Sequence, residues 1–212
     1  LGYAQFMTGD YKSAKPLFER LKDDNGQYQE ASIYYYAYLC YLDAEYKTAL
    51  NEFERLNGSK AYENSYPYYI TALYFLDKRY DEVLAYALPI LDRTKQENET
   101  EIFRIVAATY FIKGDLEKSK NYYDKFQAQD QGKTQNNQDS YQIGYIAYKL
   151  KDYPKAIQEL EKLTEPDAYY QSAMITLGDA FLKEGNKQSA RNAFFRASKL
   201  DFDPQLKEEG LF

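Results

Sequence analysis

One pattern recurs six times along the chain, at intervals of 34 to 37 residues. The recurrence is followed from one aligned position in each copy, here called the anchor: Tyr11, Tyr46, Tyr80, Leu116, Tyr153 and Lys187. A period of this length is typical of solenoid proteins, in which each unit packs only against its neighbours. The repeat therefore constrains the fold more than any other feature of the sequence.

Apolar and small residues keep fixed distances from the anchor. Ten residues before it stand Leu1, Tyr36, Ile70, Val106, Ile143 and Leu177. Nine before it stand short residues, most often Gly or Ala, and three after it stand Ala14, Ala49, Val83, Ser119, Ala156 and Ala190. The apolar residues recur at helical spacing in two blocks, so each copy predicts a pair of helices. The small residues allow the two helices to approach closely.

The turn between the two helices has its own signature. It reads Gly9-Asp10, Gly114-Asp115 and Gly185-Asn186 in three copies. Glycine can adopt the left-handed conformation that ends a helix, and Asp or Asn can cap the next one. Lys78 and Lys151 replace this glycine in two other copies, where we expect some strain.

These strings resemble the tetratricopeptide repeat. The resemblance rests on Leu1-Gly2 with Gly9 to Phe18, and on Leu177-Gly178, Gly185, Ala190, Phe194 and Ala197. It implies an all-α fold, a right-handed α-solenoid of about six helix-turn-helix repeats. We expect one array over residues 1–212, with repeats near 1–28, 29–62, 63–98, 99–135, 136–169 and 170–203. Residues 204–212 resemble the start of a further repeat, so we expect a fragment truncated at both ends.

Two stretches depart from the pattern. The third copy is weak, and its Pro89 falls inside a predicted helix, where proline removes a hydrogen bond and usually bends the helix. Residues 129–139 are polar without a break, which predicts a solvated loop.

Composition narrows the possible functions. The net charge of −6 and a pI of about 4.9 disfavour a nucleic-acid binder, and no run of 18 apolar residues predicts a membrane span. Histidine is absent and Cys40 is the only cysteine, so the usual general base, zinc motifs and internal disulfides are missing. We expect neither an enzyme nor a cofactor or metal site.

The resemblance implies a binding groove lined by the first helix of each pair. Carried over by position, the groove sites with side chains suited to binding are Tyr34, Tyr38, Tyr41, Tyr68, Phe75, Arg104, Phe111, Tyr141, Tyr145, Tyr148, Lys149, Asp179 and Lys183. Tyrosine is over-represented at binding hot spots, but each ring can equally pack against the next repeat. Tyr38, Arg104, Tyr145 and Lys149 are the residues expected to be most available to a partner.

Three functions stay open at this point. The first is a protein-interaction scaffold that holds a peptide or protein segment in this groove. The others are a glycan-binding module, which the lack of Trp disfavours, and a structural spacer or self-association array. The groove lacks the Lys and Asn pattern of domains that hold chaperone tails. The Tyr-, Lys- and Asp-rich repeats are similar in style to those of bacterial envelope proteins, which favours the envelope or periplasm over the cytoplasm and an envelope-associated partner.

Overall fold

The computed structural model describes residues 1–93, 95–164 and 166–210, and the regular secondary structure in these ranges is α-helical. The chain divides into two compact units, Leu1–Ile105 and Val106–Phe212. None of the helices in the described ranges is long and apolar enough to cross a bilayer. The all-α solenoid fold predicted from the repeat is confirmed.

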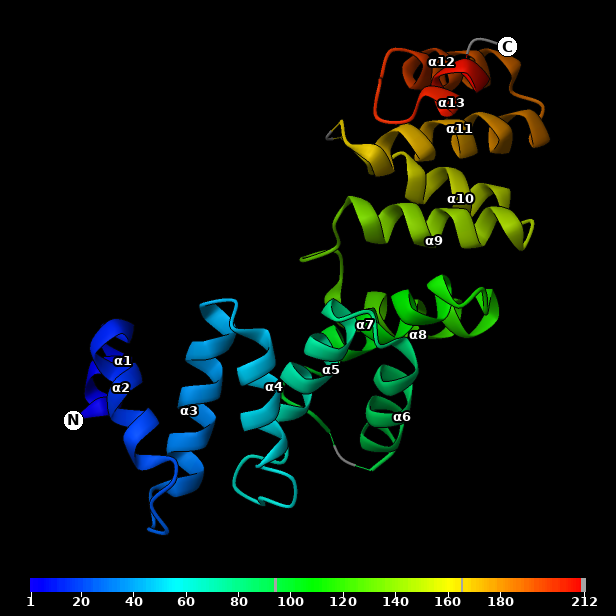
Figure 1. Cartoon of the computed structure of the whole chain (residues 1–212). Helices are drawn as coiled ribbons and strands as arrows, with labels where there is room; N and C mark the ends of the chain where they lie inside the picture. The colour runs from blue at the N-terminus through cyan, green and yellow to red at the C-terminus, as the bar shows by residue number, and fades with distance from the viewer. Residues whose placement is uncertain (94, 165, 211–212) are drawn as a thin grey trace. The chain divides into compact units, whose positions relative to one another are not determined.

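The first unit is a succession of helix pairs, each leaning on the next (Figure 1). Its helices are α1 (Gly2–Met7), α2 (Tyr11–Leu21), α3 (Gln29–Leu42), α4 (Tyr46–Glu54), α5 (Tyr66–Leu76) and α6 (Tyr80–Leu91), followed by the beginning of α7 (Glu99–Ile112). The core of this unit runs through the pairs as one cluster that includes Phe18, Ala37, Phe53 and Ile70.

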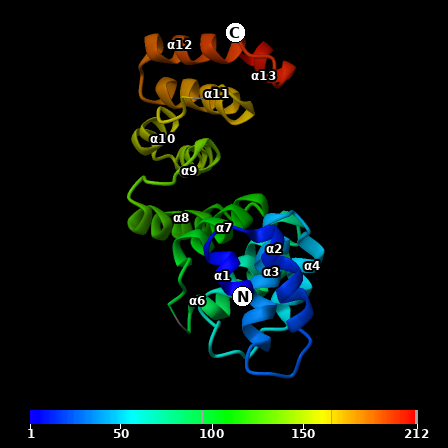
Figure 2. The same cartoon turned by 90° about the vertical axis from the view of Figure 1, so that its left-hand side faces the viewer.

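The second unit continues the same arrangement. Its helices are the end of α7, α8 (Leu116–Asp130), α9 (Asn137–Lys149), α10 (Tyr153–Leu160), α11 (Ala168–Lys183), α12 (Lys187–Ser198) and the short α13 (Pro204–Glu209). In both views α9 lies beside α10, and α11 beside α12 (Figures 1 and 2). Helix α13 falls where the sequence predicts a further repeat, and Leu211 and Phe212 lie outside the described residues.

Every anchor turns out to be the first residue of a second helix. Tyr11 begins α2, Tyr46 begins α4, and the other four anchors begin α6, α8, α10 and α12. The sequence period is therefore the distance from one helix pair to the next. Each predicted repeat interval holds one pair, although α11 begins at Ala168, two residues before the expected boundary at 170.

The turns adopt the conformation that their residues predict. Gly9, Gly114 and Gly185 have φ angles of 80°, 80° and 78°. The side chains of Asp10, Asp115, Asp152 and Asn186 each accept a hydrogen bond from the backbone N–H three residues later. Where glycine is missing the backbone is still left-handed, with φ of 59° at Ala44 and Lys78 and 65° at Lys151. Non-glycine residues pay a steric cost in this conformation, so the expected strain is present.

Small residues set the separation of the paired helices. A Cβ atom added to Gly178 would lie 2.4 Å from the ring of Phe194, and one added to Gly144 would lie 2.5 Å from the side chain of Leu160. Ala156 and Ala190 are completely buried, or nearly so, on the partner helices. The first helix of each of these pairs therefore lies against the large side chain of the second, with no room for another methyl group.

Two buried glutamates fasten successive pairs together. Glu52 and Glu159 both stand six residues after an anchor. Glu52 binds Lys22 Nζ at 2.8 Å and Arg55 Nη1 at 2.6 Å. Glu159 accepts hydrogen bonds from Gln135 at 2.9 Å and Gln127 at 3.1 Å, and Lys162 lies 2.7 Å away. Through Lys22 and Gln135, the connection after one pair is held against the second helix of the next, a link that the repeat pattern did not reveal.

The polar stretch 129–139 is only partly a solvated loop. Residues 131–134 are exposed, as expected. At one end, however, buried Asp130 accepts hydrogen bonds from the backbone N–H and the hydroxyl of Thr134. At the other end Asn136 and buried Asp139 form a capping box that begins α9. Polar residues at both ends thus have specific structural partners.

Proline occurs inside two second helices. Helix α6 continues past Pro89 to Leu91, and α2 likewise contains Pro16. Both prolines are exposed, so the ring and the missing backbone donor face solvent. The kink expected at Pro89 stays a prediction.

Ala190→Leu should lower the free energy of unfolding by about 1–3 kcal/mol, because the larger side chain has no space in the α11–α12 contact. Urea denaturation measures the change. Asn192→Leu is the matched control, since it adds the same side chain to an exposed position of α12. Equal stability of the two variants would contradict the proposed packing.

Gly114→Ala should destabilise the protein by about 1 kcal/mol, because alanine is strained at a φ of 80°. No neighbouring atom would touch the added methyl group, so backbone conformation alone is tested. The reverse change, Lys151→Gly, should leave stability equal or higher. Thermal denaturation of both variants checks the prediction, and a destabilised Lys151→Gly together with an unaffected Gly114→Ala would refute it.

Candidate functional site

The first unit carries a cluster of aromatic side chains on α3 and α5. Tyr34, Tyr38 and Tyr41 are spaced four and three residues apart, so they share one face of α3. All three are half-buried, which leaves part of each ring accessible. We call this group, with Tyr68 and Phe75 of α5, the first tyrosine face.

Tyr69 stands at the centre of this face, although it is not among the residues predicted from the sequence. Its ring lies 5.6 Å from Tyr38, 5.4 Å from Tyr41 and 5.0 Å from Tyr68, and it stacks on buried Phe53 at 4.9 Å. Tyr69 stands eleven residues before its anchor, as Tyr35 does in the preceding copy. The sequence does carry a signal for Tyr69, because the adjacent pairs Tyr34-Tyr35 and Tyr68-Tyr69 recur at the same positions in two copies.

Tyr34 is the most firmly packed of the predicted α3 residues. Its ring stacks on Tyr62 at 4.7 Å and meets Phe53 edge-on at 6.0 Å. Burial raises the pKa of Tyr34 from 10.0 to about 12, and burial likewise raises the pKa of Tyr35 to about 12. The ring therefore serves mainly to join α3 to the structure around it, while the edges of Tyr38 and Tyr41 are better placed for a partner.

The remaining predicted residues of the first unit are each engaged by a neighbour. Phe75 lies 5.8 Å from Tyr80, and burial raises the pKa of Tyr68 above its usual range. Arg104 forms an ion pair with Glu101 in the same helix, with 2.6 Å between Nη2 and Oε2. Arg104, which the sequence suggests as a residue available to a partner, therefore has an acidic neighbour in its own helix.

A second group of aromatic side chains consists of Phe111 of α7 and Tyr141, Tyr145 and Tyr148 of α9, and is called here the second tyrosine face. Phe111, Tyr141 and Tyr145 form a triangle of rings with centroid distances of 6.5, 5.7 and 5.9 Å. The ammonium group of exposed Lys149 lies 5.1 Å from the centre of the Tyr145 ring, in a cation–π arrangement. Tyr148 packs on Tyr153 at 5.8 Å. Phe111 of α7 is therefore brought together with Tyr141 and Tyr145 of α9.

Charged groups flank this second face on α11. Burial raises the pKa of Asp179, nearby Lys183 and Lys149 oppose that shift, and Glu209 adds to it. Burial raises the pKa of Tyr148 as well, and Asp179 contributes through its charge. Lys183 is exposed. A partner that meets the rings of α9 would therefore meet charges of both signs beside them.

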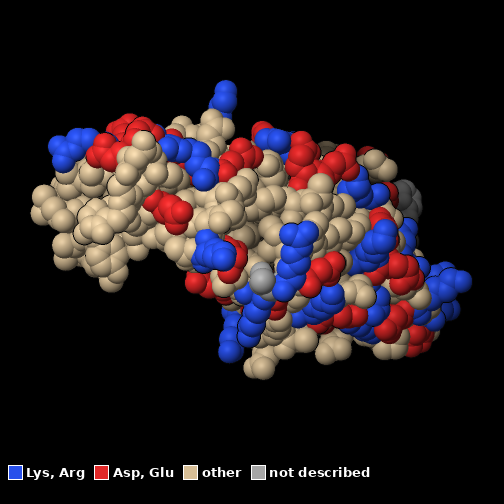
Figure 3. All heavy atoms as spheres, turned by 90° about the horizontal axis from the view of Figure 1, so that it is seen from below, with Lys and Arg blue, Asp and Glu red and all other residues tan. Residues whose placement is uncertain are grey.

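Charged and apolar side chains both reach the surface of the protein. Figure 3 shows acidic and basic side chains mixed over much of the visible face, with a tract at the left that carries few charges. At the start of the chain, Leu1, Tyr3 and Met7 are 88%, 54% and 65% exposed. Within the described residues, no group of three His, Cys, Asp or Glu side chains is arranged to hold a metal ion.

A comparison with known protein families matches residues 140–170 to the tetratricopeptide repeat. A comparison with curated proteins found no match. The chain therefore contains a tetratricopeptide repeat in the α9–α10 region, the same region that carries the second tyrosine face.

Comparison with solved structures identifies the same fold throughout. YrrB, described as a tetratricopeptide-repeat protein with an unusual peptide-binding site, has a TM-score of 0.71 and 14% identity over 92% of this chain and 97% of its own. The pilF protein of Pseudomonas aeruginosa has a TM-score of 0.71 and 15% identity, over 98% of this chain and 92% of its own. A tetratricopeptide-repeat protein from Parabacteroides merdae has a TM-score of 0.53 and 17% identity, over 100% and 80%. The fold is that of tetratricopeptide-repeat proteins.

The buried phenols make stability depend on alkaline pH. Burial raises the pKa of Tyr34 and Tyr35 in the folded protein to about 12, whereas an unfolded tyrosine has a pKa of 10.0. The stability that the two neutral phenols contribute is therefore fully present below pH 10 and should be lost as the pH rises from 10 towards 12. Urea denaturation between pH 8 and pH 11.5 measures this, with tyrosinate absorbance recorded in parallel. In the Tyr34→Phe variant the free energy of unfolding should fall less steeply with pH. An equally steep fall in that variant would contradict the role given to the Tyr34 phenol.

Proposed function

We propose that this protein is a non-catalytic protein-interaction scaffold, and that the two tyrosine faces bind a peptide or protein segment. The tetratricopeptide fold supports the general role, because stacked helix pairs present long rigid surfaces to a partner. One observation carries the more specific proposal: the rings of α3 and of α9 are held in place by packing while they remain only half-buried.

Tyrosine rings that are fixed by packing are suited to binding a partner. A tyrosine that is already packed loses little conformational freedom on binding, and it offers both an apolar face and a hydroxyl group. Tyr38 is positioned by Phe6 at 5.7 Å and Tyr69 at 5.6 Å, and Tyr145 by Phe111 at 5.7 Å. Two or three such anchors are enough for micromolar affinity, which corresponds to about −8 kcal/mol.

The similarity in fold to YrrB also supports the proposal of a peptide-binding surface. That protein is described as having a peptide-binding site, and it shares the fold at 14% identity. On this chain the partner segment would carry apolar or aromatic side chains for the rings. Charged side chains beside them would meet Lys149, Asp179 and Lys183 in the second unit.

Tyr38→Ala combined with Tyr145→Ala should lower the capture of partner proteins by at least about tenfold without unfolding the chain. Cross-linking pull-down followed by mass spectrometry measures capture, and circular dichroism checks folding. The matched control is Tyr28→Ala with Phe202→Ala, which removes two exposed aromatic rings outside both faces. If the unchanged protein, the double variant and the control capture partner proteins equally, the partners bind outside the two tyrosine faces. A response of tyrosine fluorescence to glycans, with no protein captured, would favour the glycan-binding alternative.

A further inference from the structure

Charge is unevenly divided between the helices of the first unit. Among the residues of α1, α3 and α5, the first helices of its three pairs, Glu30 is the only charged one. The second helices carry several charges, such as Lys15 and Arg20 in α2 and Lys47 in α4. Glu30 stands in the first turn of α3, where the Ser59 hydroxyl donates a hydrogen bond to it at 2.7 Å. Beyond that turn, the first helices contribute no charged side chain to the surface that they share.

Charge from other elements reaches this surface at two of its rings. Burial is the main cause of the raised pKa of Tyr34 and of Tyr68, and the charges of Glu97 and Glu101 add to it. Arg104 forms an ion pair with Glu101 at 2.6 Å. The rings between them are left with uncharged neighbours.

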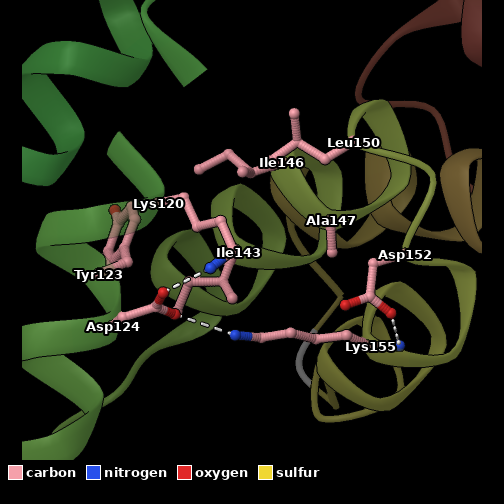
Figure 4. Close-up of a pocket in the computed structure, with 9 residues that line it drawn as sticks. All are labelled: Lys120, Tyr123, Asp124, Ile143, Ile146, Ala147, Leu150, Asp152 and Lys155. Carbon is pink, nitrogen blue, oxygen red and sulfur yellow. Dashed lines mark hydrogen bonds and ion pairs between the residues drawn. The ribbon is translucent and has the colours of Figure 1, made fainter. Parts of the chain in front are cut away.

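A crevice of the second unit shows the contrasting arrangement. Figure 4 shows that its lining includes Ile143 and Ile146 of α9. Among its other lining residues, Asp124 lies 2.6 Å from Lys120 Nζ and 3.1 Å from Lys155 Nζ. A partner that enters this crevice has to separate charges that already pair, whereas the uncharged surface of α1, α3 and α5 makes no such demand.

A chain of aromatic rings crosses this uncharged surface. The ring of Phe6 lies 5.7 Å from Tyr38, and Tyr38 lies 5.6 Å from Tyr69. Tyr69 in turn lies 5.4 Å from Tyr41 and 5.0 Å from Tyr68. Adjacent rings are inclined by 66° to 79°, so they meet edge to face instead of stacking flat. Because all five are only half-buried, a partner can pack against several fixed rings in succession.

The hydroxyl group of Tyr38 is available as a hydrogen-bond donor. Burial is the first cause of the raised pKa of Tyr38, and the nearby phenols of Tyr11 and Tyr41 add to it. No hydrogen bond and no charged group from the described residues is among these causes. A segment that covers Tyr38 should therefore bring an acceptor, because a donor that is covered without a partner costs free energy.

Different kinds of partner segment place different demands on a surface. A segment that binds as an added strand needs an exposed sheet edge, and the regular structure of the described residues is helical. A phosphorylated or strongly acidic segment needs a cluster of cations, and α1, α3 and α5 carry none. An amphipathic helix and a polyproline segment are the two kinds that the uncharged rings can accommodate.

A polyproline segment suits these rings better than a helix does. The carbonyl groups of a helix are paired within it, so they leave the Tyr38 hydroxyl without an acceptor, whereas polyproline II has no internal hydrogen bonds. An ordinary extended segment would also bring one N–H group per residue to a surface whose own helices offer no carboxylate beyond Glu30. Proline has no N–H group, and its ring packs well on aromatic surfaces.

We propose, on the basis of the function proposed above, that the first tyrosine face takes an uncharged, proline-rich segment of a partner protein in the polyproline II conformation. Its proline rings would pack on Tyr38 and Tyr41, and one of its carbonyl groups would accept a hydrogen bond from the Tyr38 hydroxyl. The binding should depend little on salt, because neither side contributes a charge to it.

Three uncharged synthetic peptides with blocked ends serve as probes. Two of about twelve residues repeat Pro-Pro-Gln or Ala-Ala-Gln, and a helical one of about 20 residues combines Leu with Gln. Fluorescence anisotropy should give micromolar binding of the Pro-Pro-Gln peptide and at least about tenfold weaker binding of the other two. Equal binding of either control peptide would overturn the assignment of a polyproline segment. Absence of Pro-Pro-Gln binding would overturn the proposal as a whole.

Salt tests whether the recognition is uncharged. Affinity for the Pro-Pro-Gln peptide should change by less than about twofold between about 0.05 M and about 0.5 M sodium chloride. A loss of about tenfold over this range would show that charges hold the peptide, and would overturn the proposal.

Two changes at Tyr38 separate its ring from its hydroxyl. Tyr38→Phe keeps the ring and its packing, and should weaken the Pro-Pro-Gln peptide about fivefold through the lost hydrogen bond. Tyr38→Ala should weaken it at least about tenfold. Circular dichroism checks folding, and Tyr38→Phe keeps the test valid if Tyr38→Ala fails to fold. Unchanged affinity in folded Tyr38→Phe and Tyr38→Ala proteins would refute the proposal.

Matched controls come from tyrosines outside the first tyrosine face. Tyr28→Phe and Tyr28→Ala change a ring that is 65% exposed and belongs to neither face, and Tyr145→Ala changes the second tyrosine face. All three should leave the affinity for the Pro-Pro-Gln peptide unchanged. Equal weakening by these variants and by Tyr38→Ala would mean that the peptide binds tyrosines without regard to position, and would overturn the site.

Failure of this proposal can be distinguished from failure of the proposed function. If the Tyr38→Ala/Tyr145→Ala protein loses its captured partners but the unchanged protein binds no Pro-Pro-Gln peptide, the scaffold function stands and the proline-rich partner is wrong. If Tyr38→Phe weakens the peptide while capture stays equal in all variants, the captured partners bind elsewhere and the proline-rich specificity of the face stands. Glycan binding that Tyr38→Ala abolishes, with no peptide bound, would refute the proposal.

Discussion

The close contact between the two helices of each pair is the constraint on which the rest of the structure depends. Gly144 and Gly178 lie against Leu160 and Phe194 so closely that no Cβ atom would fit without movement. Short helices gain most of their stability from such packing rather than from their own hydrogen bonds. The other pairs carry Gly2, Ala37, Thr71 and Ala107 at the same position, so a short side chain is kept at this contact along the sequence.

Tyrosine connects stability with recognition in this protein. The rings of α3 and α5 pack on each other and on Phe53, and burial raises the pKa of Tyr34 as a result. The same rings leave their edges accessible, so a surface for a partner is maintained by the contacts that hold the helices together. A rigid aromatic surface of this kind costs little entropy on binding. Tyr69 shows the connection most directly, because one ring touches both the core and three residues of the face.

Substitution within a fixed repeat can change a surface without changing the fold. Lys15, Leu50 and Lys120 occupy equivalent positions, yet the two lysines form ion pairs with acidic neighbours while the leucine is buried. Glu52 and Glu159 also occupy equivalent positions, and both bind groups from the preceding connection. A repeat protein can thus vary the chemistry of one unit at a position where its neighbours keep an ion pair.

The sequence by itself determined the helix pairs, the turn conformations and the caps, because these depend on local spacing and on residues such as Gly114 and Asp115. It also places Tyr34, Tyr38 and Tyr41 on one face of a helix, because they are spaced four and three residues apart. Contacts between helices were decided only by the tertiary structure. Which side chains meet decides three features: the central place of Tyr69, the pairing of Arg104 with Glu101, and the buried ends of the 129–139 stretch. A repeat period fixes positions along the chain, whereas distances between side chains follow from how the helices pack.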